Sequence, residues 1–276
     1  GFGLGRLLGL ELFAEGYSAG SIVAIAFVMD LLDVTIVNSI YDKTTGLIDL
    51  QQVTAMHGTG VQMNVVASRF AQDTSHTHYL LRSDFTVDTG TADGISASSV
   101  SVLRSLTTGT ITAMVGDTAA NLAQLVARDD QLDITVSASS GTVTAAQLTS
   151  IDAATLGMVH ANSAILLTGS VSDVQRIVTA SGVSLSGSEA ITLDNTGTVA
   201  AADLALIDTK TSGLITATGI VKLTGTADVV ASVVTSNGMS LSGIEAVTVS
   251  DVGSLSAATL NAIHGTTTGV LDRKSV

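Results

Sequence analysis

The residues best suited to chemistry gather in one short span. The segment DTSHTHYLLRSDF contains His76, His78 and Arg82, although the chain has only 5 His and 11 Lys or Arg. In a strand the two histidines would share one face, and His57 or Asp84 could complete a metal site. Ordinary histidines in a solvated loop explain the span better, because no third ligand has convincing spacing. We predict no metal site, but a specific site would be sought here first.

Acidic turns are the second candidate. Asp194 with Asn195, and Asp251, fall between an expected strand and an expected helix, where oxygen ligands could bind Ca²⁺ in a row. One carboxylate per repeat supplies too few oxygen ligands for a calcium ion. Such side chains more often make the turn by bonding nearby backbone. We therefore predict that these residues form turns and hold no metal or other cofactor.

Catalytic patterns are weak. Glu189 and Glu245 stand at matched positions of two successive repeats, which indicates a structural place in each repeat. No Ser–His–Asp set, phosphate loop or dinucleotide fingerprint occurs in the required context. A carbohydrate-active protein would need clustered carboxylates or basic residues on one face, and the repeats supply neither. We predict that the chain is not an enzyme and assign no catalytic, cofactor-binding or metal residues.

Threonines recur beside the repeated glycines, and a flat rank of threonines can bind ice. Their positions place them at helix ends, where no flat strand face is expected, so ice binding remains only an alternative. They are Thr44, Thr45, Thr107, Thr108, Thr211 and Thr266 to Thr268.

The elements that would carry these residues come from one stretch that occurs five times, each copy ending in a glycine. An apolar residue stands six and nine places before that glycine, and a helix-capping residue stands thirteen before it in four copies. This pattern predicts a short capped helix with one buried face, and the glycine suits a left-handed exit. The glycines are Gly46, Gly109, Gly157, Gly213 and Gly269, and the residues at the capping position are Asp33, Ser96, Thr144, Ala200 and Ser256.

Weaker glycines, Gly182 and Gly238, divide each of the last two repeats into a short half and then a long half. Each half is expected to be a strand followed by a helix. The short half begins with ILLTG or VKLTG and the long half with AITLD or AVTVS.

The alternation of halves makes specific predictions about packing. We expect Ile191 and Val247 in one parallel sheet, with VKLTG between them. Leu204 and Leu260 should form a buried row, and Asp208 should lie on the outer face.

Composition limits the fold and the partners. The chain is 46% hydrophobic but has only five Phe and three Tyr, so thin regular layers of Val, Ile, Leu and Ala must build the core. A net charge of −13 disfavours nucleic acid, whose phosphates attract Lys and Arg. The absence of cysteine excludes disulfides and thiolate metal sites. The apolar run at 22–29 is too short to span a bilayer.

These patterns predict an α/β fold, a right-handed β/α solenoid similar in logic to leucine-rich repeats. We expect two helices in residues 1–31, which would form an N-terminal cap, followed by a repeat solenoid over 32–276. Within it, residues 51–93 are irregular and 94–276 regular. The helix in DTAANLAQLVARDD should begin at the cap Asp117.

At DTAANLAQL and SLSGSEAITLDNTGTVAAADLALID the chain resembles repeats of very long secreted and surface proteins of bacteria. These are adhesin-like or haemolysin-like proteins of marine or cyanobacterial type, and the resemblance covers roughly residues 32–276. Such proteins often carry calcium-binding GGxGxDxUx nonapeptides. None occurs here, so calcium binding does not follow from the resemblance.

The expected function is therefore a structural or adhesive segment of a large extracellular or cell-surface protein. A carbohydrate-binding or carbohydrate-active solenoid and an ice-binding surface are the alternatives. Expected partners are a surface or polysaccharide ligand and either further repeats or a second copy meeting the uncapped C-terminal end. There the rows of Val249, Leu260 and Ile263 would be exposed.

Overall fold

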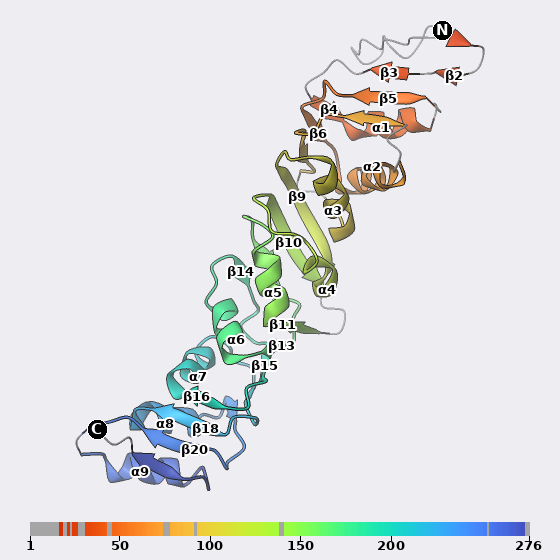
Figure 1. The fold of residues 1–276 in the computed structure, drawn as a ribbon. Helices are drawn as coiled ribbons and strands as arrows, with labels where there is room; N and C mark the ends of the chain where they lie inside the picture. Colours follow the sequence, from red (N-terminus) through yellow and green to blue (C-terminus); the bar gives the residue numbers. More distant parts are fainter. Residues whose placement is uncertain are drawn as a thin grey trace. The chain divides into compact units, whose positions relative to one another are not determined.

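The computed structural model describes residues 17–18, 21–22, 24–26, 31–42, 46–73, 78–90, 93–137, 141–252 and 254–273. The chain divides into two compact units. Unit 1 comprises residues 1–117, 124–135 and 153–158, and unit 2 comprises 118–123, 136–152 and 159–276. Both are mixed α/β, with mostly parallel strands and short helices (Figure 1).

Among the described residues of unit 1, the strands form two sheets and an antiparallel pair, and the printed pairings within the two sheets are parallel. One sheet has the order β10-β9-β8-β6-β4, another β3-β5-β7, and β1 pairs with β2. The strands are β1 (Tyr17–Ser18), β2 (Ser21–Ile22), β3 (Ala24–Ala26), β4 (Leu31–Asp33), β5 (Leu47–Leu50), β6 (Ala55–His57), β7 (Tyr79–Leu81), β8 (Thr86–Asp88), β9 (Ile111–Thr118) and β10 (Gln131–Ser137).

The helices described in unit 1 start at capping residues. They are α1 (Val34–Tyr41), α2 (Gly60–Gln72) and α3 (Ala97–Leu106), and α2 packs against both of the others. Asp33 and Ser96 accept hydrogen bonds from first-turn N–H groups of α1 and α3, which confirms both predicted caps. Thr59 and Gln62 form a capping box on α2.

Unit 2 repeats the same local architecture. Its strands have the orders β11-β13-β15-β17-β19 and β16-β18-β20-β21, with a further pair β12-β14, and every printed pairing is parallel. The strands are β11 (Thr142–Thr144), β12 (Val159–His160), β13 (Leu166–Gly169), β14 (Val183–Ser184), β15 (Ala190–Leu193), β16 (Thr198–Ala200), β17 (Ile215–Thr216), β18 (Lys222–Gly225), β19 (Met239–Ser240), β20 (Ala246–Val249) and β21 (Leu271–Arg273).

The helices described in unit 2 follow one another along the ribbon from α4 to α9, and consecutive helices pack together (Figure 1). Thr144 and Ser256 cap α5 and α9 as predicted. The helices are α4 (Ala119–Leu122), α5 (Ala145–Asp152), α6 (Val171–Val178), α7 (Ala201–Asp208), α8 (Ala227–Val234) and α9 (Ala257–His264).

The strand register of unit 2 overturns one prediction. Thr168 pairs with Thr192, and Thr192 pairs with Thr216. The sequence separation between the paired residues is the same in both cases, and we call this separation the strand step. One sequence repeat, from Gly213 to Gly269, is longer than two strand steps. The strand of the next repeat is therefore displaced into another sheet. Ile191 lies in β15 and Val247 in β20, which belong to different sheets, so the prediction of a shared sheet is wrong.

The core consists of aliphatic rows, as the composition predicts. Val143, Leu167, Ile191 and Ile215 are aligned in register and fully buried. Leu204 is buried as expected, whereas Leu260 is only partly buried.

Two further expectations about exposure are wrong. Asp208 is half-buried, because its carboxylate accepts a hydrogen bond from Ser236 Oγ at 2.9 Å and lies over Gly238. Val249 and Ile263 are buried, at 1% and 0% exposed.

One predicted helix is wrong, and another is shorter than predicted and begins at a different cap. The apolar residues before position 31 form the short strands β2 and β3 where the structure describes them, and β3 pairs with β5, so sheet pairing prevails over helical periodicity. The other expected cap helix lies outside the described residues. In DTAANLAQLVARDD the helix α4 ends at Leu122, and its cap is Thr118 rather than Asp117.

The repeated glycines have a different cause from the one expected. The φ angles of Gly109, Gly157, Gly213 and Gly269 are not in the left-handed region. A Cβ at Gly213 would lie 2.3 Å from the carbonyl oxygen of Glu189, and the other three would meet backbone oxygens at similar distances. Glycine is needed because two backbone segments touch there.

Candidate functional site

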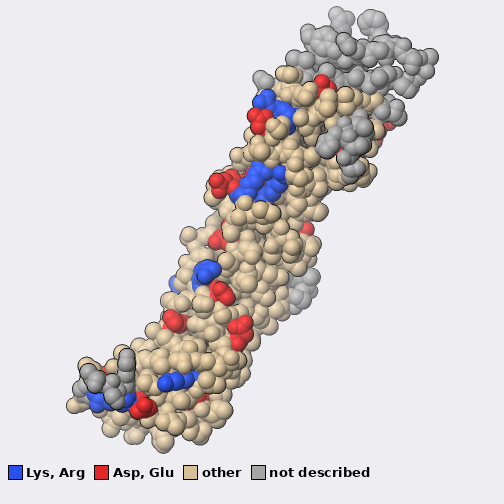
Figure 2. Space-filling view, in the orientation of Figure 1, with Lys and Arg blue, Asp and Glu red and all other residues tan. Residues whose placement is uncertain are grey.

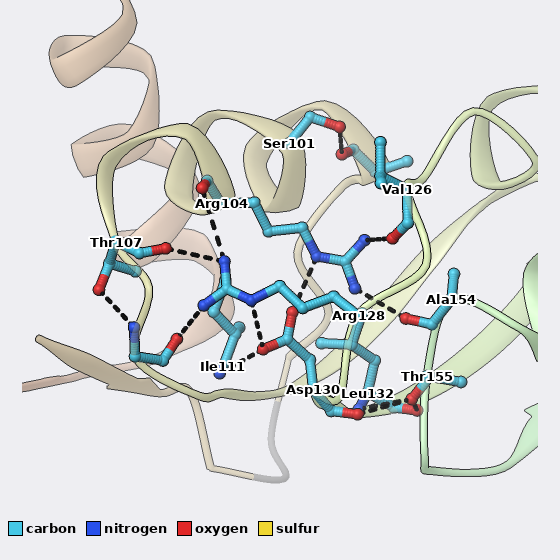
Figure 3. Close-up of polar contacts among 12 residues, drawn as sticks. Ser101, Arg104, Thr107, Ile111, Val126, Arg128, Asp130, Leu132, Ala154 and Thr155 are labelled. Carbon is cyan, nitrogen blue, oxygen red and sulfur yellow. Dashed lines mark hydrogen bonds and ion pairs between the residues drawn. The ribbon is translucent and has the colours of Figure 1, made fainter. Parts of the chain in front are cut away.

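The most strongly buried charged cluster lies in unit 1 and joins Arg104, Arg128 and Asp130. The carboxylate is fully buried, and the Arg104 side chain is 8% exposed. Arg104 Nε donates to Asp130 Oδ2 at 2.8 Å, and Arg128 Nε lies 3.6 Å from Asp130 Oδ1. Figure 3 shows the two guanidinium groups converging on this carboxylate.

The remaining donors of both arginines bind backbone carbonyls. Arg104 donates to the carbonyls of Val126 and Ala154, each at 2.7 Å. Arg128 donates to the carbonyls of Thr107 and Gly109, at the end of α3, where free carbonyl groups and the helix dipole favour a cation.

Asp130 is equally occupied. One carboxylate oxygen accepts from the N–H of Ile111 at 2.9 Å, while its backbone carbonyl accepts from Thr155 Oγ1 at 3.2 Å. A carboxylate with no exposed surface and a bond to each oxygen cannot meet a substrate. The cluster therefore clamps the irregular segment after α4 to its neighbours. The sequence analysis missed it, although two arginines around one aspartate are conspicuous in a chain so poor in basic residues.

The histidines do not come together as a metal site. His57 on β6 is aligned in register between Asp33 and Asp88. Asp84 instead forms an ion pair with Arg82. His76 lies outside the described residues. Among the described residues, no group of three or more His, Cys, Asp or Glu side chains could hold a metal ion.

His78 belongs to an aromatic cluster. Its ring centroid lies 5.8 Å from that of Tyr41, which stacks on Tyr79 at the same distance. The Arg69 guanidinium lies 4.4 Å from the Tyr41 ring centroid and bonds to Asp42. With Arg69 and Tyr79 both packed against Tyr41, the cluster fits a structural role better than a sugar-stacking platform.

Among the described residues, three ionisable groups have shifted pKa values. Burial raises the pKa of Asp33, but hydrogen bonds from Thr35 and the nearby His57 outweigh burial and hold the pKa of that carboxyl below its usual value. The hydrogen bond from Arg82 lowers the pKa of Asp84. Burial raises the pKa of Tyr79 far above the physiological range. None of these shifts produces a group poised to exchange protons near neutral pH.

The acidic turns act as helix caps rather than as local turn formers. Asn195 Oδ1 accepts from the N–H of Val171 at 2.6 Å, and Asp251 Oδ2 accepts from that of Ala227 at the same distance. Each donor is the first residue of a helix, and it precedes its acceptor by 24 residues. The prediction that these side chains bond to nearby backbone is therefore wrong, because the N–H group that each one binds belongs to the preceding strand step. Asp194 is exposed.

Glu189 and Glu245 occupy equivalent buried places, 2% and 1% exposed. Each carboxylate accepts one hydrogen bond from a serine three residues earlier, Ser186 at 2.7 Å and Ser242 at 2.8 Å. Glu189 Oε1 has no partner among the described residues. The matched geometry agrees with a structural place in each repeat.

The described threonines beside the repeated glycines bond to backbone, and Thr107, Thr211 and Thr267 are buried while Thr108, Thr266 and Thr268 are exposed. Thr211 Oγ1 donates to the carbonyl of Glu189 at 2.7 Å and accepts from the N–H of Gly213 at 2.9 Å. Thr267 repeats both bonds with Glu245 and Gly269. Thr44 and Thr45 lie outside the described residues. These hydroxyls lock successive steps together and do not form an exposed rank.

A different row of hydroxyls lies on the outer side of a sheet in unit 2. The pairings Thr144↔Thr168, Thr168↔Thr192, Thr192↔Thr216 and Thr216↔Ser240 place five hydroxyl residues in register. All five are partly exposed. Adjacent members are separated by roughly 4.8 Å, the spacing of neighbouring strands. The signal was a hydroxyl residue after an apolar residue at every strand step, which the longer sequence repeat concealed.

Charged residues form no broad patch on the face shown in Figure 2, where Lys, Arg, Asp and Glu appear as separate spots on a mainly uncharged surface. Within the part of the chain that the structure describes, no helix is long and apolar enough to cross a membrane.

Comparisons with known proteins returned no family model, no curated protein and no solved structure that matches the chain. The function is therefore inferred from the geometry and chemistry of the described residues.

Proposed function

We propose that the chain is a structural and adhesive repeat segment of a large extracellular or cell-surface bacterial protein, without a catalytic role. The observation that carries this proposal is the recurrence of the same bonds at matched positions of successive repeats. Thr211 and Thr267 make equivalent backbone locks, and Asn195 and Asp251 make equivalent caps. Side chains that sequence patterns offer for chemistry are used to join one strand step to the next.

The proposed architecture is a right-handed β/α solenoid. Parallel pairing at a constant strand step supports it, as does the packing of consecutive helices in unit 2. Crossovers between parallel strands are nearly always right-handed, which sets the proposed hand. In such a fold each repeat buries its apolar face only against the neighbouring repeats.

The proposed location and binding role rest on the surface and on the resemblance to long bacterial surface proteins. A mainly uncharged face suits contact with a neutral polymer better than with nucleic acid (Figure 2). We propose a polysaccharide or another hydroxyl-rich surface as the ligand class.

Incubating the chain with insoluble cellulose, chitin and starch tests this function. We expect a fraction of the chain to sediment with at least one polymer, with no soluble sugar released over hours. Release of reducing sugar that increases with protein concentration would overturn the non-catalytic proposal. Failure to sediment with every polymer would overturn the polysaccharide ligand class.

Ice binding is the second candidate, and the row from Thr144 to Ser240 favours it. Regularly spaced methyl and hydroxyl groups on a flat parallel sheet can order water in a repeating pattern. Paired threonines also stabilise sheets by themselves, which is the competing explanation for this row.

Thermal hysteresis and ice-crystal shaping distinguish the two explanations of the row. If it binds ice, Thr192→Lys should abolish hysteresis, whereas Thr218→Lys, at an exposed residue outside the row, should leave it unchanged. Absence of hysteresis in the unaltered chain would remove this candidate.

A further inference from the structure

A groove of about 550 Å³ lies in unit 2 between β20, α9 and β21. Three leucines in its lining, Leu255, Leu260 and Leu271, are each only partly buried. The groove is lined by Val249, Ser254, Leu255, Leu260, Leu271, Asp272 and Arg273.

One repeat earlier, the equivalent apolar positions are fully covered. They are at most 5% exposed, and they are Leu193, Val199, Leu204 and Ile215. Their cover includes the next short half: β18 pairs with β16, and α8 packs against α7. Leu223 and Val230 of that short half are themselves completely buried. The internal repeat therefore shows what kind of segment fits such a groove.

The backbone beside the groove is extended in the same way as a paired strand one repeat earlier. Residues 254–256 correspond to β16, which pairs with β18 through Thr198↔Lys222. Ser256 has φ −67° and ψ 129°, close to the −77° and 130° of Ala200, so the chain is extended at the same point. No strand of the described chain pairs with residues 254–256. Free backbone groups on an extended segment favour addition of another strand.

We propose that this groove is a docking site for one further short half of the same repeat type. The occupant is a strand resembling β18 followed by a helix resembling α8. Its strand would pair with residues 254–256, and its apolar side chains would cover Leu255 and Leu260. This docking role goes beyond the proposed adhesive function and would hold even if no polysaccharide binds.

The test replaces residues 274–276 with a copy of residues 218–238, which keeps the register because Arg273 corresponds to Ala217. The chain lacks cysteine, so Leu255→Cys provides a single thiol reporter in the groove, and its counterpart Val199 is only 5% exposed where a short half covers it. We expect the extension to slow thiol labelling by about tenfold or more, because labelling then requires local opening. Amides of residues 254–260 should also exchange more slowly with solvent.

A matched control carries Leu223→Ser and Val230→Ser only in the copied segment, which preserves its length but removes the side chains that enter the groove. We expect this control to label as fast as the unextended chain. Equal labelling in all three proteins would overturn the proposal. Protection of the unextended chain that grows with protein concentration would assign the groove to a second copy and would also overturn it.

Discussion

At the scale of single residues, the polar side chains of this protein form hydrogen bonds with backbone groups more often than with one another. Arg104 and Arg128 both bind main-chain carbonyls as well as the single carboxylate between them. Buried polar groups require such partners, because an unpaired one costs free energy comparable to a lost hydrogen bond. Because these side chains are already hydrogen-bonded, the residues suited to catalysis do not form a site.

Replacing Asp130 by Asn should be strongly destabilising. The change leaves two largely buried arginines without their shared counter-charge, and breaking a buried ion pair typically costs about 3–5 kcal/mol. Chemical denaturation measures the loss. Asp194→Asn, at an exposed position, should change stability by less than about 0.5 kcal/mol. Equal losses in the two variants would show that the cluster is not a structural clamp.

Gly213→Ala should lower stability by about 1–3 kcal/mol, as expected for overpacking against backbone. The added Cβ would lie 2.3 Å from the carbonyl oxygen of Glu189, which cannot rotate away. Gly197→Ala is the control, because nothing lies within 4 Å of its Cβ. A Gly213→Ala protein that melts like the control would contradict the close-approach explanation of the repeated glycines.

The residue scale also shows the limit of the sequence. The repeated glycines and the matched Glu189 and Glu245 could be recognised as structural from their spacing. The bonds of Thr211, Asn195 and Asp251 could not, because each joins segments that are distant in the sequence and whose register was unknown.

At the scale of elements, the capped helices could be predicted and the sheets could not. Capping is local, so Asp33, Ser96 and Thr144 identified their helix starts directly. Sheet membership depends on the step between paired strands. Two strand steps are shorter than one sequence repeat, so equivalent strands fall in different sheets.

The cap across one strand step makes a prediction for α8. Thr226 makes no side-chain capping bond, so Asp251 supplies the cap from the following strand step. Asp251→Ala should cost about 1 kcal/mol, the usual value of a lost cap, and should speed hydrogen exchange in the first turn of α8. Asp194→Ala should leave that exchange unchanged. Unaltered exchange in Asp251→Ala would contradict the cap.

The cap of α1 should respond to acid. The folded pKa of Asp33 is below its usual value, so its contribution to stability is present above about pH 3.9 and is lost as pH falls through the folded pKa. Asp33→Ala should therefore reduce the acid dependence of stability measured by denaturation from neutral pH down to strongly acidic pH. An unchanged pH profile would contradict this contribution.

At the scale of the whole molecule, two compact α/β units are each built by repeating a strand and a short helix. The proposed solenoid adds one requirement, that the strand step rather than the longer sequence repeat sets which strands are neighbours. Composition indicated aliphatic layers correctly, but only the register reveals the row of threonines and the groove beside α9.

Cross-linking of paired cysteines tests this register most directly. The chain has no cysteine of its own, so Thr192→Cys can be combined with either Thr216→Cys or Thr248→Cys. Thr192 and Thr216 are aligned in adjacent strands, whereas Thr192 and Thr248 are equivalent in sequence but lie in different sheets. With a short thiol-specific cross-linker we predict rapid intramolecular linkage of the 192/216 pair and little of the 192/248 pair. Preferential linkage of the 192/248 pair would contradict the account.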